Sequence, residues 1–217
     1  MKSLLLFPFN GNARESIAVI EAINKQKQEW NAIGFVDDDL DTLDRSFANC
    51  RVIGNRDAFK RFESAFILAV PGRPENFHKR QRIIESLHVH SERFATLIHP
   101  SSAIGPGVSI GKNVLIMAHV TLTAGVNIGN HVVILPGTVV SHDSVIEDFS
   151  MVGSNVVIAG GVTVERVSYI GSGSSVKQGI TIGAGALVGM GSVVIRNVIS
   201  GSTVAGCPAN QIERIDR

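Results

Sequence analysis

The 217-residue chain contains two cysteines, one tryptophan and one tyrosine, and its formal net charge is only +1. Cys50 and Cys207 lie far apart in the sequence, and two unpaired thiols are typical of a protein kept in a reducing, cytoplasmic compartment. The small net charge gives no reason to expect nucleic acid or an anionic membrane as a partner. Few aromatic residues beside 22 glycines favour a repetitive solenoid over an aromatic-rich globule.

A long hydrophobic run at the N-terminus is also missing. Residues 3–7 are apolar, but the run stops at Pro8 and is far too short to cross a membrane. It also lacks the small-residue cleavage site of a signal peptide. We therefore expect a strand at this position and no membrane insertion.

What the chain does contain is a repeat of six residues. From Ile98 to Val194 every sixth residue is isoleucine, leucine or valine, and a small or β-branched residue stands four positions after each. A fixed hexapeptide period is typical of a parallel β-helix. The seventeen aliphatic positions are Ile98, Ile104, Ile110, Ile116, Leu122, Ile128, Ile134, Val140, Ile146, Val152, Ile158, Val164, Ile170, Val176, Ile182, Val188 and Val194.

A single hexapeptide is too short to bury a core, so the repeats must stack on one another. A short strand and a tight turn, repeated three times, close a triangular coil of eighteen residues with the aliphatic side chains inside. Seventeen hexapeptides therefore predict about five and two-thirds coils, stacked at a strand spacing of roughly 4.8 Å. We expect all seventeen aliphatic residues to be buried. Residues eighteen apart should lie one above the other on the same edge of the prism.

The first ninety-four residues lack this period. Apolar runs at 3–7, 32–36 and 65–70 predict strands, and each is followed by a stretch with a helical pattern. Strands that alternate with helices favour a small parallel α/β domain of Rossmann-like type. Residues 94–98 predict a last strand that leads into the prism. We expect two domains, a Rossmann-like α/β domain at 1–94 and a β-helix with a C-terminal tail at 95–217.

Ligands of such α/β domains bind at the carboxyl ends of the strands. Residues 8–12 pass from a strand to a helix, where backbone N–H groups could hold a phosphate. The acidic run 37–39 follows the second strand and could accept hydrogen bonds from ribose hydroxyls. Gly11 stands alone, without a G-x-G-x-x-G pattern. An ordinary turn with a capping asparagine is therefore the alternative to a nucleotide site.

Three histidines in the repeat region raise the question of a zinc site. His119, His131 and His142 are spaced by twelve and eleven residues, not eighteen. They should therefore lie on different edges of the prism, and we expect no metal.

His142 differs from the other histidines because Asp143 follows it at an outward position on an edge. A carboxylate orients such a ring and favours the imidazolium, so His142 could act as a base. Gly160 comes eighteen residues later, about 5 Å away by strand spacing, and leaves its backbone N–H unobstructed. A base beside a free N–H is the minimum set for acyl transfer. The alternative is an ordinary surface His–Asp turn.

The hexapeptide array, the His142–Asp143 pair and the closing Val-Ala-Gly-Cys-Pro-Ala of residues 204–209 resemble the hexapeptide acyltransferases. Together with Gly-Phe-Val-Asp-Asp at 34–38 and Leu-Ile-His-Pro-Ser-Ser at 97–102, they make the whole chain similar to sugar acetyltransferases. This family is typified by bacillosamine and perosamine N-acetyltransferases and sialic acid O-acetyltransferases. The resemblance implies a left-handed parallel β-helix and a homotrimer, with acetyl-CoA in the cleft between neighbouring prisms. It also implies that the N-terminal domain binds a nucleotide-linked sugar.

The same resemblance assigns roles to individual residues. His142 is expected to be the general base, Asp143 the residue that tunes it, and the Gly160 N–H the oxyanion donor. The residues expected to bind acetyl-CoA are Gly160, Gly171, Ser172, Lys177, Ala205, Gly206 and Pro208. Those expected to bind the nucleotide-linked sugar are Asn10, Gly11, Asn12, Asp37, Asp38, Gly72 and Arg73.

The chain departs from the family pattern at several positions. The family's Gly-x-Gly-Gly-His loop is Phe-Asn-Gly-Asn-Ala at residues 9–13, and the pair is His-Asp where some relatives have His-Glu. Met151 replaces a histidine found in relatives nine residues after the catalytic one. Asn210 stands where lysine or arginine is common, so a contact to a CoA phosphate is expected to move to Lys177 or Arg196.

These observations predict an acetyl-CoA-dependent N-acetyltransferase acting on a nucleotide-linked amino-sugar of the 4-amino-4,6-dideoxyhexose type, in surface-glycan synthesis. The first alternative is an O-acetyltransferase acting on a sialic-acid-like sugar hydroxyl. The pair His142–Asp143 does not distinguish the two, because either acceptor must lose a proton to the same base. Further alternatives are a transferase with serine or a non-nucleotide sugar as acceptor, a metal-dependent hydratase and a non-enzymatic scaffold.

Overall fold

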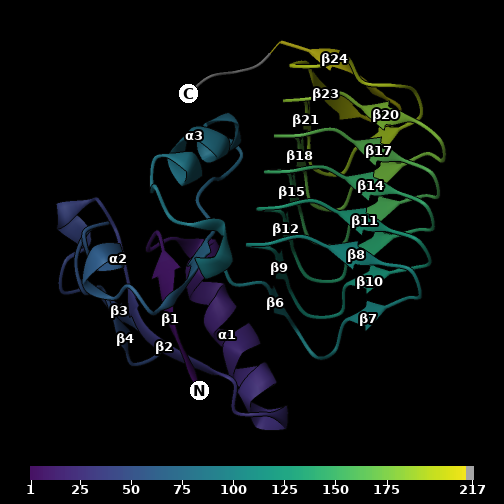
Figure 1. Ribbon diagram of the computed structural model, residues 1–217. Coiled ribbons are helices and arrows are strands. Elements are labelled where there is room, and N and C mark those ends of the chain that lie inside the picture. Colours follow the sequence, from purple (N-terminus) through teal and green to yellow (C-terminus); the bar gives the residue numbers. More distant parts are fainter. Residues whose placement is uncertain (214–217) are drawn as a thin grey trace.

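The computed structural model describes residues 1–213 and shows an α/β domain beside a β-solenoid (Figure 1). No helix within these residues is long and apolar enough to cross a membrane. The elements of the α/β domain are β1 (Lys2–Phe7), α1 (Gly11–Gln26), β2 (Trp30–Phe35), η1 (Leu40–Thr42), β3 (Ser46–Phe47), β4 (Cys50–Arg51), α2 (Ala58–Arg61), β5 (Phe66–Ala69), η2 (Phe77–Lys79), α3 (Arg80–Glu85) and η3 (Ser91–Arg93).

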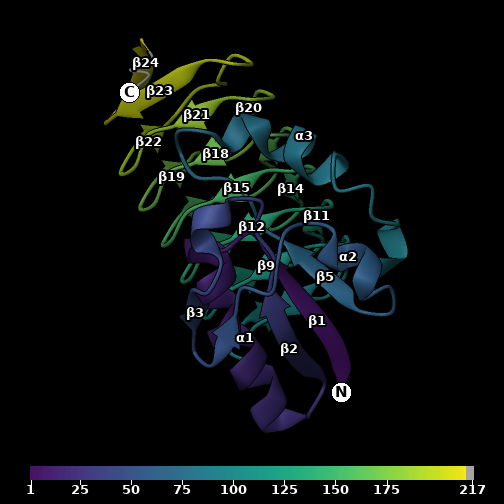
Figure 2. The ribbon, with the colours of Figure 1, turned by 90° about the vertical axis from the view of Figure 1, so that its left-hand side faces the viewer.

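The sheet of the α/β domain has the order β2-β1-β5, and all its strands are parallel (Figure 2). The three predicted strands and the helices between them are present. Helix α1 begins after Asn10, whose side chain accepts a hydrogen bond from the backbone N–H of Ala13 at 2.9 Å. Ile17 and Ile20 of this helix are buried. The hairpin of β3 and β4 has no counterpart in the sequence prediction.

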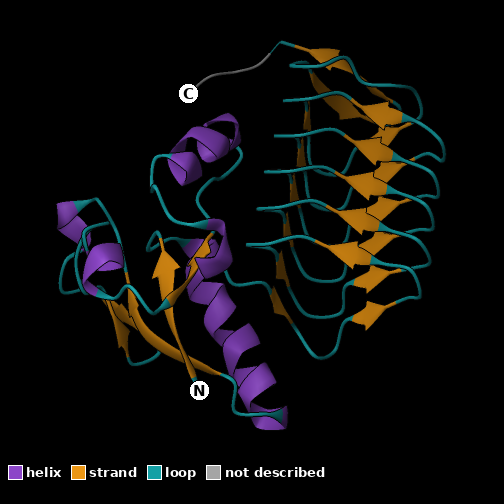
Figure 3. Ribbon diagram, in the orientation of Figure 1, coloured by secondary structure: helices purple, strands orange, loops and turns teal. Residues whose placement is uncertain are grey.

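The solenoid consists of seventeen two-residue strands in three parallel sheets, which confirms the predicted five and two-thirds coils (Figure 3). The first sheet contains β6 (Leu97–Ile98), β9 (Leu115–Ile116), β12 (Val133–Ile134), β15 (Met151–Val152), β18 (Tyr169–Ile170) and β21 (Leu187–Val188). The second contains β7 (Ala103–Ile104), β10 (Thr121–Leu122), β13 (Val139–Val140), β16 (Val157–Ile158), β19 (Ser175–Val176) and β22 (Val193–Val194). The third contains β8 (Ser109–Ile110), β11 (Asn127–Ile128), β14 (Val145–Ile146), β17 (Thr163–Val164) and β20 (Thr181–Ile182).

Fourteen of the seventeen repeated aliphatic residues are buried in one continuous core. The prediction that all seventeen are buried is wrong for the first coil, where Ile98 and Ile110 are half-buried and Ile104 is 41% exposed. No coil precedes them, so one side of each faces solvent. At the other end, the antiparallel strands β23 (Thr203–Gly206) and β24 (Ala209–Ile212) close the stack, with Val204 in the core.

Three edges join the sheets of the prism, and each is named here after one of its residues. The Gly171 edge follows the strands of the first sheet, the His142 edge those of the second, and the Asn113 edge those of the third. The outer face of the first sheet packs against α1, with Leu97 and Leu115 in one cluster with Ile17. The His142 edge therefore lies opposite the face that the α/β domain covers (Figure 1).

Candidate active site

The imidazole of His142 lies against the backbone of Gly160, one coil along. A Cβ built on Gly160 would stand 2.4 Å from Nε2 and 2.5 Å from Cε1 of the ring, so only glycine leaves room for it. Nδ1 of His142 lies 2.9 Å from Oδ2 of Asp143. A proton on Nδ1 would be donated to that carboxylate, which leaves the Nε2 lone pair free to accept a proton. The eighteen-residue stacking predicted for this pair is present.

The backbone N–H of Gly160 makes no hydrogen bond to any residue between 1 and 213. At the other two edges, the equivalent N–H groups of Asn130 and Ser154 donate to the side chains of Asp148 and Ser172. The N–H of Gly160 therefore has no partner among the described residues and lies next to the His142 ring. A donor in this place can stabilise the oxyanion that develops when a thioester carbonyl is attacked.

The candidate site is open on its outer side. The side chains of His142 and Asp143 are 60% and 76% exposed. Asp143 in turn packs over Gly125, where an added Cβ would lie 2.9 Å from Oδ1. A ligand that runs along the His142 edge can thus reach Nε2 directly.

The residues predicted to bind acetyl-CoA lie on two different edges of the prism. Lys177 and Gly160 both lie on the His142 edge, where Lys177 is exposed and Gly160 is buried. Gly171 and Ser172 lie on the Gly171 edge. The tail packs against the same edge, since a Cβ added to Gly189 would stand only 2.9 Å from the Cβ of Ala205. Gly206 and Pro208 belong to the same tail hairpin. One chain therefore does not bring all of these residues to a single surface.

The residues predicted to bind the nucleotide-linked sugar are close together at the carboxyl ends of β1, β2 and β5. The N–H of Phe9 donates to Oδ2 of Asp37 at 2.7 Å, and Nδ2 of Asn10 donates to the carbonyl of Val70 at 2.9 Å. Nδ2 of Asn12 lies 3.5 Å from the carbonyl oxygen of Gly72. These bonds join the three loops to one another. The neighbouring Gly11 and Arg73 are exposed.

Asp38 is held by a partner that the sequence analysis missed. Its carboxylate forms an ion pair with Arg56, with 2.6 Å between Nη2 and Oδ2. The hydrogen bond from this guanidinium is the main reason why the pKa of Asp38 lies below its usual value. Asp37 instead accepts hydrogen bonds from the backbone N–H groups of Phe9 and Asp39.

An apolar groove of about 450 Å³ runs between α1 and the Gly171 edge. Arg14, which lines the groove, also contacts the loop of residues 8–12, since its Nε lies 3.3 Å from the carbonyl oxygen of Asn10. The residues that line it include Arg14, Ile17, Ala18, Phe47, His99, Met117, Ala118 and Pro136. Arg14 and Phe47 were not predicted from the sequence, because the groove forms only where α1 and the hairpin of β3 and β4 meet residues of the solenoid that are distant in the chain. Burial, and to a lesser degree the charge of His119, lowers the pKa of His99.

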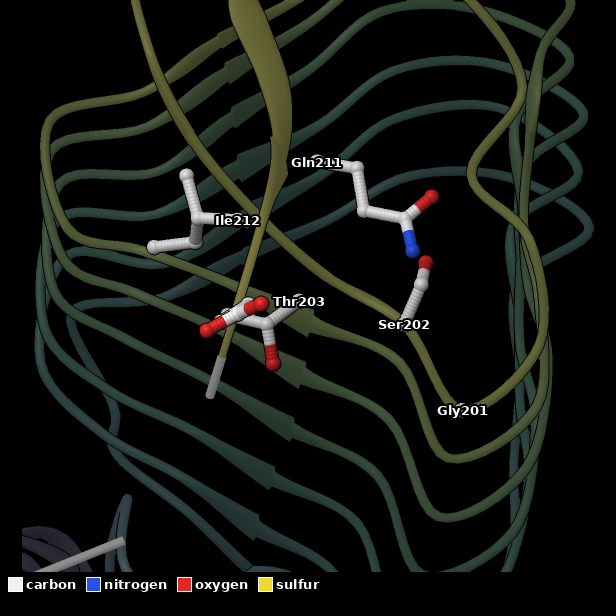
Figure 4. A pocket seen from close by; sticks show the side chains of 6 residues that line it. Gly201, Ser202, Thr203, Gln211 and Ile212 are labelled. Carbon is white, nitrogen blue, oxygen red and sulfur yellow. The ribbon is translucent and has the colours of Figure 1, made fainter. Parts of the chain in front are cut away.

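A second hollow, of about 520 Å³, lies at the C-terminal end of the solenoid. It is lined by Gly201, Ser202, Thr203, Gln211, Ile212 and Glu213, and Ser202 and Gln211 point toward one another there (Figure 4). None of the predicted site residues belongs to it.

The three histidines of the repeat region lie on three different edges, as their spacing predicts. His119 follows β9, His131 follows β11 and His142 follows β13. Within residues 1–213, no three side chains of His, Cys, Asp or Glu gather closely enough to hold a metal ion.

Comparison with known proteins agrees with this fold. The family model of the GMPPB C-terminal domain matches residues 94–204. A search of curated proteins finds no significant match. The structure of PerB from Caulobacter crescentus in complex with CoA and GDP-perosamine is 26% identical, with a TM-score of 0.82 and 98% of each chain covered.

Two further structures are similar over nearly the whole chain. The acetyltransferase domain of PglB from Neisseria gonorrhoeae is 25% identical, with a TM-score of 0.85 and 98% of this chain and 100% of that one covered. The same domain has been solved in complex with acetyl coenzyme A. WeeI from Acinetobacter baumannii, at 24% identity, a TM-score of 0.79 and coverage of 98% and 100%, supports the fold. The chain therefore belongs to the GMPPB C-terminal domain family and to the hexapeptide-repeat β-helix acetyltransferases.

Proposed function

We propose that this protein is an acetyl-CoA-dependent N-acetyltransferase that acts on a nucleotide-linked amino-sugar of the 4-amino-4,6-dideoxyhexose type, in surface-glycan synthesis. The observation that carries the proposal is the position of His142 Nε2 over Gly160, beside a backbone N–H without a partner. The similarity to a structure that contains CoA and GDP-perosamine supports both substrate classes.

The reaction follows from this geometry. The amino group of the sugar attacks the thioester carbonyl, while Nε2 of His142 takes the proton that the nitrogen loses. The carbonyl oxygen becomes an oxyanion and accepts a hydrogen bond from the Gly160 N–H. When the C–S bond breaks, the CoA sulfur leaves with the electron pair and receives the proton from the imidazolium. Asp143 orients the ring through Nδ1 and stabilises its charged form.

We further propose that the working site lies between two chains of a homotrimer. The ligand loops of the α/β domain stand by the first sheet, whereas the His142 edge lies opposite that sheet. A sugar held by one chain therefore meets His142 of its neighbour. The apolar groove is lined by Arg14 of α1 and by Pro136 of the solenoid. Pro136 follows β12 and His142 follows the next strand, β13, so these two residues lie at nearly the same height along the prism. A ring of three chains repeats this contact with closed symmetry.

The positions of the residues predicted to bind acetyl-CoA also support a site between chains. Gly160 and Lys177 lie on one edge of the prism, and Gly171 and Ser172 lie on another. One CoA molecule contacts both groups when the His142 edge of one chain faces the Gly171 edge of the next.

The experiment is a screen of UDP-, GDP- and dTDP-linked amino-sugars with acetyl-CoA, in which the release of free CoA thiol is followed. We expect one amino-sugar to give rapid thiol release and an acetamido product. Thiol release only with a sialic-acid-like hydroxyl acceptor would favour O-acetylation instead. Light scattering should give three times the chain mass of 23.1 kDa, and an active monomer would contradict the shared site.

A further inference from the structure

The loop that follows β5 is fastened to the solenoid by a buried asparagine. Asn113 is fully buried on the Asn113 edge. Its Oδ1 accepts a hydrogen bond from the N–H of Ala69, and its Nδ2 donates to the carbonyl of Ala69, both at 2.7 Å. The Asn113 side chain thus makes both hydrogen bonds that the backbone of a neighbouring strand could make with Ala69, the last residue of β5. The next residues, Val70 to Arg73, form a loop that contains Gly72 and Arg73, which are predicted to bind the nucleotide-linked sugar.

A buried arginine holds the same loop from the other side. Arg80 is fully buried, and its guanidinium donates to the carbonyl oxygens of Pro71, His131 and Phe149. No carboxylate within residues 1–213 forms an ion pair with it. A buried charge is costly unless it is well bonded, and here two of the three carbonyls come from the Asn113 edge. Arg80 therefore links the loop and the solenoid.

The loop also lies flat on the stem of Arg80. A Cβ on Gly72 would stand 2.7 Å from Cγ and 2.9 Å from Cδ of Arg80, and the φ of Gly72 is +108°. Only glycine allows both this approach and this backbone conformation. The position of the loop thus depends directly on where Arg80 is held.

The support beneath these contacts is a ladder of stacked residues. Asn113, His131 and Phe149 follow one another at intervals of eighteen on the same edge. Nδ1 of His131 lies 2.9 Å from Nδ2 of Asn113, and the ring of His131 stacks on that of Phe149 at 4.7 Å between centroids. The ring of Phe94 packs edge-on against His131. This ladder holds Asn113 and the carbonyl acceptors of Arg80 in one fixed arrangement.

We infer that Asn113 and Arg80 are positioning residues that set the affinity for the nucleotide-linked sugar by fixing the loop of residues 70–73 against the solenoid. This inference rests on the proposed function, since it takes that loop as part of the sugar-nucleotide site. Asn113 lies on an edge other than that of His142, and Arg80 belongs to α3 of the α/β domain. Both act through the loop rather than on the thioester. The uncompensated charge of Arg80, directly behind the loop, also favours an anionic ligand such as a pyrophosphate.

The test uses two substitutions with matched controls. Asn113→Asp keeps the size and the acceptor but removes the donor to Ala69, and Asn31→Asp makes the same change at an exposed position of β2. Arg80→Met removes the buried guanidinium, and Arg82→Met makes the same change at an exposed position of α3. Arg80→Lys keeps the charge but cannot reach three carbonyls at once. Arg80→Lys therefore separates the effect of the charge from that of the hydrogen-bond geometry. It also replaces Arg80→Met in the test where Arg80→Met does not fold.

Two measurements are made on folded variants: hydrogen exchange of the backbone amides of residues 69, 70, 72 and 73, and the KM of each substrate in the acetyl-transfer assay. We expect faster exchange and a KM for the nucleotide-linked sugar raised about tenfold in Asn113→Asp and Arg80→Met, with the KM for acetyl-CoA and kcat nearly unchanged. Arg80→Lys should fall between Arg80→Met and the wild type. Both controls should behave as the wild type.

Other results overturn the inference. Faster exchange with an unchanged KM for the sugar would show that the affinity for the sugar does not depend on how firmly the loop is held. An equal rise of both KM values would show a general structural effect. A wild-type protein that acetylates no nucleotide-linked amino-sugar would instead refute the proposed function itself, and hydrogen exchange would still report whether the loop is fastened.

Discussion

Gly160 lies so close to His142 that a methyl group on its Cα would stand 2.4 Å from Nε2 of the ring. The missing side chain leaves room for the imidazole, and the Gly160 N–H beside it has no hydrogen-bond partner within residues 1–213. The proposed base and the proposed oxyanion donor thus come from neighbouring coils, eighteen residues apart.

Gly160→Ala should therefore abolish most activity without unfolding the protein. The φ of Gly160 lies outside the left-handed region, so alanine fits the backbone, but its methyl displaces the ring and disturbs the N–H. We expect kcat to fall by about 10²–10³ with a nearly unchanged melting temperature. The control is Gly107→Ala on the same edge, where φ is +71° and the nearest atom would be 3.6 Å away. It should lose some stability and keep its kcat, and the reverse pattern would place the chemistry elsewhere.

Cys207→Ser should leave turnover within a few-fold of the wild type. Cys207 is exposed in the turn between β23 and β24, and direct attack by the amine has no use for a thiol nucleophile. Steady-state kinetics with both substrates checks this. A complete loss of turnover in a folded variant would point to an acyl-cysteine intermediate instead.

The core of the solenoid should be most sensitive in its middle coils. Ile146 is fully buried, whereas Ile104 in the first coil is 41% exposed. Ile146→Ala should cost about 2–5 kcal/mol of unfolding free energy, and Ile104→Ala should cost clearly less. Denaturant titration of both variants measures the difference. Equal losses would mean that the first coil is covered in solution.

Acid should weaken the contact between the α/β domain and the solenoid. Burial, and next the charge of Arg80, lowers the pKa of His131 to about 4 from 6.5, while Asp148 and Glu85 act in the opposite direction. The unfolded chain binds more protons between these values, so stability falls as the pH drops from about 6.5 to about 4. The loss is on the order of 3 kcal/mol at most.

Melting temperatures across this pH range test the role of His131. His131→Phe should flatten the profile between pH 6.5 and 4, whereas a change at the exposed His90, such as His90→Gln, should leave the wild-type profile. A wild-type slope retained in His131→Phe would assign the acid sensitivity to another group.

The sequence predicted the repeat region well because its period never slips. Counting by eighteen was enough to bring Gly160 to His142 and to separate the three histidines. The same count could not reveal that another coil packs against only one side of the first coil, so Ile104 was wrongly expected in the core. Asn113 and Arg80 escaped prediction for another reason. Their contacts join residues 44 and 69 positions apart across two domains, and no periodic pattern relates such positions.

The most direct test of the proposed mechanism is kcat of His142→Ala with acetyl-CoA and the nucleotide-linked amino-sugar found in the screen. General-base catalysis contributes about 10²–10⁴-fold, so kcat should fall by that order. Substrate KM should change far less, because the ring acts mainly in the transition state. The kcat of Asp143→Asn should lie between those of the wild type and His142→Ala, since the imidazole remains but loses its orienting charge. A near-normal kcat for His142→Ala on the true substrate would contradict the assignment of this site.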